Sequence, residues 1–125
     1  MTHTDDNGSA VLEFLAFGIP GVLLTLLAFQ FIWAGYLSNV AFDAASEAAG
    51  VAALYDGTEP AGEARGSAVM KQISAAAIAT VNVTPAALAG QPAERATVQV
   101  SSPLLAFGAI PIMQSAVSIH EGLSQ

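Results

Sequence analysis

The stretch from residue 14 to residue 42 contains no charged side chain, and its first part, residues 14–37, is almost entirely apolar. At about 1.5 Å per residue, an α-helix over residues 14–37 is roughly 36 Å long, whereas the hydrocarbon core of a bilayer is about 30 Å thick. Trp33 and Tyr36 lie near the end of this segment, where amphipathic rings favour the membrane interface. The sequence therefore predicts one transmembrane helix.

A cleaved secretory signal is the competing interpretation of this segment. Such a signal has an apolar region of about 7 to 15 residues that follows basic residues. Here the apolar region is longer, and Asp5 and Asp6 precede it. These features favour a retained helix. Its orientation does not follow from charge, because no Lys or Arg lies near either end of the segment.

A single carboxylate, Glu13, stands at the start of the apolar segment, and the small residues Gly8 and Ser9 come shortly before it. An acidic side chain at the centre of a membrane helix costs about 2.5 to 3.5 kcal/mol on insertion scales, so one held at the membrane entrance indicates a function. We expect Glu13 to have a partner or a role in processing. The plainer alternative is that Glu13 only marks the wet end of the helix.

Gly18, Pro20 and Gly21 cluster inside the predicted membrane helix. A proline within a helix removes one hydrogen bond and its ring clashes with the preceding turn. A kink or a locally melted turn is therefore expected at this cluster. The alternative is that the three residues reflect the ordinary composition of membrane helices, in which proline and glycine are common.

The helical pattern continues beyond residue 37 as an alanine-rich stem, which we expect to end near Tyr55, where Asp56 and Gly57 form a turn signal. Small residues four apart let helix backbones approach closely. They form two rows, Ala41, Ala45, Ala49 and Ala53, and Ala44, Ala48 and Ala52. Asp43 and Glu47 lie on one face, which predicts a solvated side, with a metal-binding pair as the alternative.

A second helix is predicted to start around residues 58–60, where a capping threonine, an early acid and a first-turn proline occur together. Its apolar positions have the spacing of a helix with one buried face. These positions are Val69, Ile73, Ala76 and Ala77. The second helix should fold back on the stem.

The last third of the chain changes to the two-residue period of half-buried strands, over residues 96–101 and 115–120. Residues 81–84 are a candidate third strand, which Pro85 is expected to end. The fold class is therefore α+β: a long N-terminal transmembrane helix, its stem, a second helix and a small antiparallel sheet of two or three strands.

Two connections are expected in this region. Residues 86–94 have the composition of a loop. Residues 103–111 are unusually apolar for a connection, and we expect them to close over the small core. The alternative is a contact patch for a partner or for the bilayer surface.

Composition excludes several classes of function. The 125 residues carry a net charge of -7 with three basic side chains and no cysteine, so no basic patch for nucleic acid and no disulfide or thiolate metal site is available. An enzyme would need a nucleophile with its base, convergent acids or metal ligands. The histidines are His3 and His120, and we expect His120 to be a surface or edge-strand residue. We predict no enzyme activity, no catalytic residue, no metal and no cofactor.

The chain resembles the TadE-like family, which comprises pilin-related proteins of the tight-adherence (Tad, type IVc) pilus system. The resemblance rests on residues 8–14, Pro20, the long apolar helix and residues 43–49. It covers most of the chain, since the family also tends to finish with a strand, an apolar connection and a last strand that ends near a glutamate. Glu121 is the corresponding glutamate here. Members of the family are regarded as pseudopilins or minor pilins.

The resemblance implies that a prepilin peptidase cuts between Gly8 and Ser9. Residues 1–8 would then be a cytoplasmic leader, residues 9–37 the transmembrane helix, and residues 38–125 an extracytoplasmic stem and small α+β domain. The implied partners are the membrane, the peptidase, pilin and other minor pilin subunits, and the inner-membrane assembly platform. The implied location is the cytoplasmic (inner) membrane as a single-pass protein, or a surface pilus.

The resemblance also implies a mechanism for Glu13, which becomes the fifth mature residue. In pilin-type filaments this carboxylate is thought to meet the new α-amino group of a neighbouring subunit. A unit pair at about 4 Å is worth up to roughly 4 kcal/mol at an effective dielectric near 20, before desolvation is subtracted. The alternative function is a single-pass membrane-anchored scaffold or interaction domain that is never processed.

Overall fold

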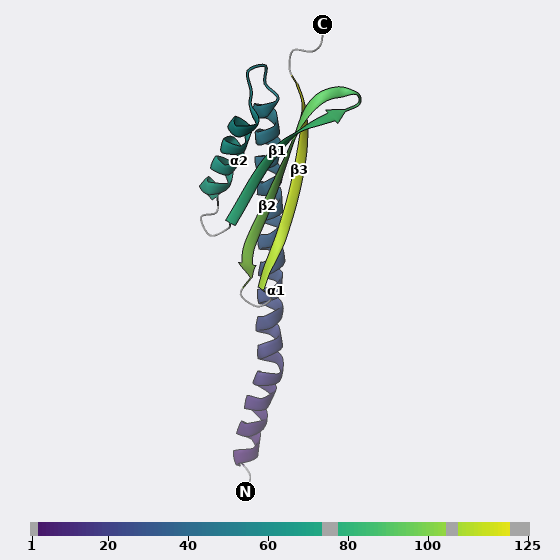
Figure 1. Ribbon diagram of the computed structural model, residues 1–125. Helices are drawn as coiled ribbons and strands as arrows, with labels where there is room; N and C mark the ends of the chain where they lie inside the picture. Colours follow the sequence, from purple (N-terminus) through teal and green to yellow (C-terminus); the bar gives the residue numbers. More distant parts are fainter. Residues whose placement is uncertain (1–2, 74–77, 105–107, 121–125) are drawn as a thin grey trace. The chain divides into compact units, whose positions relative to one another are not determined.

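The computed structural model describes residues 3–73, 78–104 and 108–120 (Figure 1). The chain divides into two compact units, Met1–Trp33 and Ala34–Gln125. The order of elements is α1, α2, β1, β2, β3, with a long N-terminal helix, a second helix and a three-stranded antiparallel sheet. The predicted α+β class is confirmed.

Helix α1 spans His3–Ala52 and has Pro20 inside it. It is helical at Gly18, Pro20 and Gly21, so of the two alternatives, a kink or a locally melted turn, the structure leaves the kink. A proline removes one backbone hydrogen bond, and membrane helices tolerate this loss where neighbouring groups adjust. The kink itself stays a prediction.

The connection between the helices is short. α1 ends three residues before the predicted Tyr55, and a turn follows in which the Gly57 amide donates to the Leu54 carbonyl at 2.9 Å. Helix α2, Glu59–Ile73, begins where predicted. The Thr58 hydroxyl accepts a hydrogen bond from the Ala61 amide at 3.2 Å, which satisfies one of the unpaired donors of the first turn.

Helix α2 packs closely on the stem part of α1 through two glycines. A Cβ added at Gly62 would lie 2.5 Å from the Ala48 carbonyl oxygen, and one added at Gly66 would lie 3.1 Å from the Ala48 Cβ. The absence of side chains at both positions lets the two helix backbones meet, so α2 folds back on the stem as predicted. Both alanine rows of the stem are buried, Ala41, Ala45, Ala49 and Ala53, and Ala44, Ala48 and Ala52.

The sheet has the order β1-β2-β3, with β1 at Ile78–Leu88, β2 at Gln91–Leu104 and β3 at Gly108–Ile119. Figure 1 shows the three strands side by side. Val83, Val98 and Val100 are among the largest fully buried side chains, and they share one core cluster with Leu37 and the stem alanines. The C-terminal unit is thus held together by its sheet, which packs on the alanine face of the stem.

Two predictions for β1 and β2 are wrong. Pro85 does not end β1, and the expected loop at residues 86–94 is a hairpin whose strands pair from Leu88 with Gln91 onward. Its two turn residues, Ala89 and Gly90, have φ values of 51° and 80°, as a tight two-residue turn requires.

The position of Pro85 explains why β1 continues. The Val83 amide donates a hydrogen bond to Glu63 Oε1 of α2 at 3.1 Å, which shows that this amide points away from β2. Backbone amides of a strand alternate in direction, so the nitrogen of Pro85, two residues later, also faces away from β2. Pro85 therefore removes no hydrogen bond from the β1–β2 ladder.

Other expectations fall partly outside the described residues. Ala76 and Ala77 of the predicted second-helix face lie there, and so do residues 105–107 of the apolar connection. The rest of that connection belongs to strands, since β2 runs to Leu104 and β3 begins at Gly108. Its closure over the core stays a prediction.

The bond between Glu63 and the Val83 amide gives a stability prediction. We expect Glu63→Ala to lower the free energy of unfolding by about 1.5–3 kcal/mol, because a partly buried amide loses a charged acceptor. Glu47→Ala is the matched control, since the pair between Glu47 and Arg65 is exposed and such pairs contribute about 0–1 kcal/mol. Denaturant unfolding followed by circular dichroism in detergent micelles measures both; equal losses would contradict the role of Glu63.

Candidate functional site

The candidate site begins with Gly8 and Ser9, which lie in the first turns of α1 and are exposed. A Cβ added at Gly8 would meet nothing within 4 Å. No described atom of the chain therefore fills the space beside Gly8, although the bond itself is part of the helix.

Glu13 lies four residues after Ser9, and it too is exposed. Residues four apart on a helix are neighbours on one face, with Cβ atoms about 5–6 Å apart. Within the described residues, the Glu13 carboxylate has no ion pair and no hydrogen bond. The structure thus brings Ser9 and Glu13 to one face of α1 and gives Glu13 no partner of its own chain there.

The helix that follows presents large apolar side chains outward, with Phe14, Phe17 and Phe31 75%, 78% and 76% exposed. A stretch within Asn7–Ala52 is long and apolar enough to cross a membrane. Thr25 is one of its few polar side chains, and its hydroxyl donates a hydrogen bond to the Gly21 carbonyl of the same helix at 2.9 Å. This surface needs an apolar environment, from lipid or from other helices.

The stem alanines, in contrast, are buried within the C-terminal unit. They are covered by α2 and by the sheet of the same chain, as the close approach of Gly62 and Gly66 shows. The exposed stem residues include Asp43 and Glu47, as predicted for a solvated side. Arg65 Nε lies 2.6 Å from Glu47 Oε2, so Glu47 already has a cationic partner, and this disfavours the metal-binding alternative.

Sequence reasoning missed a partly buried pair at the end of the sheet. Glu94 Oε1 lies 3.0 Å from His120 Nε2, and the two side chains are 9% and 30% exposed. Glu94 Oε2 is buried without a hydrogen-bond partner among the described residues. The His120 amide also donates to the Pro92 carbonyl at 3.1 Å, so His120 fixes the end of β3 to the start of β2. The expected loop at residues 86–94 concealed this pair, because it left Glu94 outside any strand.

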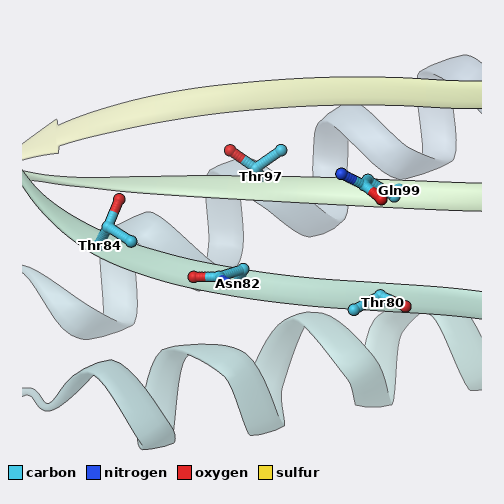
Figure 2. A pocket seen from close by; sticks show the side chains of 5 residues that line it. All are labelled: Thr80, Asn82, Thr84, Thr97 and Gln99. Carbon is cyan, nitrogen blue, oxygen red and sulfur yellow. The ribbon is translucent and has the colours of Figure 1, made fainter.

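The outer face of the sheet carries a shallow hollow of about 370 Å³ (Figure 2). Five side chains from β1 and β2 line it: Thr80, Asn82, Thr84, Thr97 and Gln99. The strand register places Thr80 opposite Gln99 and Asn82 opposite Thr97. Hydroxyls and carboxamides both donate and accept hydrogen bonds but do not titrate near neutral pH. The lining can bind polar groups and offers no proton transfer of its own.

Among residues 3–73, 78–104 and 108–120, no group of three or more His, Cys, Asp or Glu side chains could hold a metal ion. The features that remain as a candidate site are therefore Gly8, Ser9 and Glu13, together with the apolar surface of α1. The chain matches no protein-family model, no curated protein and no solved structure.

Proposed function

We propose that this protein is a minor pilin or pseudopilin that takes part in assembly of a Tad-type pilus. One observation carries the proposal: Glu13 has no partner within the described chain, lies one helical turn after the Gly8–Ser9 bond, and adjoins an exposed apolar helix surface. A carboxylate in that position can form an ion pair between subunits when a neighbouring subunit supplies a cation. The resemblance to the TadE-like family supports the same function.

The proposed first step is hydrolysis by a prepilin peptidase. Water adds to the Gly8 carbonyl carbon, the bond to the Ser9 nitrogen breaks, and the products are a Gly8 carboxylate and a Ser9 α-amine. An α-amino group has a reference pKa of about 7.7–8.0, so the new terminus is mostly cationic at neutral pH. Cleavage thus creates a cationic group, the Ser9 α-amine, with which a Glu13 carboxylate can pair.

The proposed second step is packing of the mature helix among other pilin subunits. The apolar side chains of α1 exchange lipid for neighbouring helices, and the carboxylate of Glu13 pairs with the amine of an adjacent subunit. Desolvation offsets much of the attraction between two such charges, which makes an ion pair a stronger determinant of register than of overall affinity. The assembly platform of the inner membrane would receive subunits whose leader has been removed and whose residues 38–125 lie outside the cytoplasm.

Intact mass of the protein from its native host membrane tests the proposal. We expect loss of residues 1–8, with Ser9 as the first residue of the mature chain. Full-length protein would contradict the proposal and favour the unprocessed membrane-anchored scaffold. A cut beyond Gly35 would instead indicate a secreted protein.

The Gly8→Leu variant is expected to remain at full length, because a bulky side chain next to the cut bond obstructs the peptidase. Gly35→Leu is the matched control: a Cβ at Gly35 also meets nothing within 4 Å, but this position is far from the cut. Intact mass should show the control processed like the native chain. Normal processing of Gly8→Leu would place the cut elsewhere.

A further inference from the structure

The bond that the proposed function requires to be cut lies inside a helix. α1 begins at His3, so Gly8 and Ser9 are both helical. In an α-helix the Gly8 carbonyl accepts a hydrogen bond from the Leu12 amide, and the Ser9 amide donates to the Asp5 carbonyl. A peptidase that attacks the Gly8 carbonyl must therefore act on a chain in which these bonds have opened.

The residues at the cut are poorly suited to a helix. Asn7, Gly8 and Ser9 follow one another, and all three have lower helix propensity than alanine, with glycine the poorest of them. They also lie within two turns of the helix start, where the first amides lack helical partners and opening breaks few bonds. The residues that follow directly include the good helix formers Ala10, Leu12 and Glu13.

We propose that Asn7, Gly8 and Ser9 form a helix-weak hinge, and that local opening of this hinge sets the rate at which the leader is removed. This inference rests on the proposed function. Proteolysis of a transiently opened segment follows the population of the open form when opening and closing are fast. In this proposal the three residues weaken the helix through their backbone, and Gly8 in addition leaves room for the peptidase beside the cut bond.

Two variants at Asn7 separate helix opening from side-chain recognition. Asn7→Ala and Asn7→Gly both remove the carboxamide, but alanine favours the closed helix and glycine favours the open form. We expect leader removal to be about fivefold faster for Asn7→Gly than for Asn7→Ala, with the native chain between them. If the peptidase instead reads the Asn7 side chain, both variants are slowed to a similar extent.

Pulse-labelling of the full chain in its host membrane, followed by intact mass over time, measures these rates. Amide hydrogen exchange on the unprocessed native chain in lipid nanodiscs is a second readout. We expect the Ser9 to Leu12 amides to exchange faster than those near Leu23, and Asn7→Ala to slow them. Equal processing rates for the two variants, or equal protection of both regions, would overturn the hinge. A native chain that is never cut would instead overturn the proposed function.

Discussion

The Gly62→Val variant is expected to lose the docking of α2 on the stem. A Cβ at this position would lie 2.5 Å from the Ala48 carbonyl oxygen and 3.0 Å from the Ala52 Cβ. The nearest atom belongs to the backbone of α1, so no change of side-chain rotamer relieves the clash. Overpacking costs about 1–3 kcal/mol when neighbours can adjust, and a β-branched side chain against backbone should reach or exceed the upper end of this range. Thermal unfolding of the full chain in detergent micelles, followed by circular dichroism, measures the loss.

Gly50→Ala is the matched control for this prediction. Gly50 lies in the last turn of α1, and a Cβ there would meet nothing within 4 Å. Replacing a helical glycine with alanine stabilises by up to about 0.5–1 kcal/mol, the value for a helix interior. The two glycine variants should therefore shift the melting temperature in opposite directions. If the Gly62→Val protein had the same melting temperature as the native chain, the docking of α2 would not depend on close contact with the α1 backbone.

The helices could be predicted because their signals are local. The start of α2 follows from Thr58 and its first-turn neighbours, and the Ala61 amide does bond the Thr58 hydroxyl. Alanines four apart predict a face on which another helix can lie. The sequence predicted that the second helix folds back on the stem, but not that it makes the contact through Gly62 and Gly66, since the contact joins residues far apart in the chain.

The sheet was harder to predict because its limits depend on partners. Pro85 suggests the end of a strand only if its nitrogen faces the neighbouring strand, and the contact between Val83 and Glu63 shows the opposite direction. The hairpin turn carries Ala89 at φ 51°, where glycine or asparagine would be the usual signal. The length of β1 therefore depends on which way the Pro85 nitrogen faces, and the turn lacks the usual residue at its first position that would have signalled it.

The candidate site follows from the sequence more directly than the sheet does. Spacing alone places Ser9 and Glu13 on one helix face, and the structure shows both exposed. The pair between Glu94 and His120 could not be found in this way, because the two residues are 26 positions apart and meet only when β2 and β3 pair. Local patterns describe the N-terminal site well since every residue in it belongs to one helix.

Glu13→Ala is expected to insert into the membrane normally and to fail in assembly. The carboxylate has no partner in the described chain, so its removal costs no intramolecular contact, and it makes the helix more apolar. Assembly, in contrast, would leave the neighbouring α-amine buried without its counter-charge, which costs more than the intact pair contributes. Each 1.4 kcal/mol lost at a contact lowers its equilibrium constant about tenfold, and the same loss recurs at every subunit of a filament. We therefore expect a decrease of about tenfold or more in assembled material.

Carbonate extraction tests insertion of this variant, and the amount of sheared filament or of cross-linked pilin neighbours tests assembly. Asp43→Ala is the control, since Asp43 is another exposed carboxylate on α1 and its removal changes the net charge equally. If Glu13 acts through its position beside the new terminus, only Glu13→Ala should fail. Equal assembly by both variants would contradict the ion pair, and equal failure would indicate an effect of net charge.

Because cleavage creates the cation, the Glu13 carboxylate should matter only after the leader has been removed. Introducing Glu13→Ala into a chain that already carries Gly8→Leu should therefore cause no further loss of association between subunits.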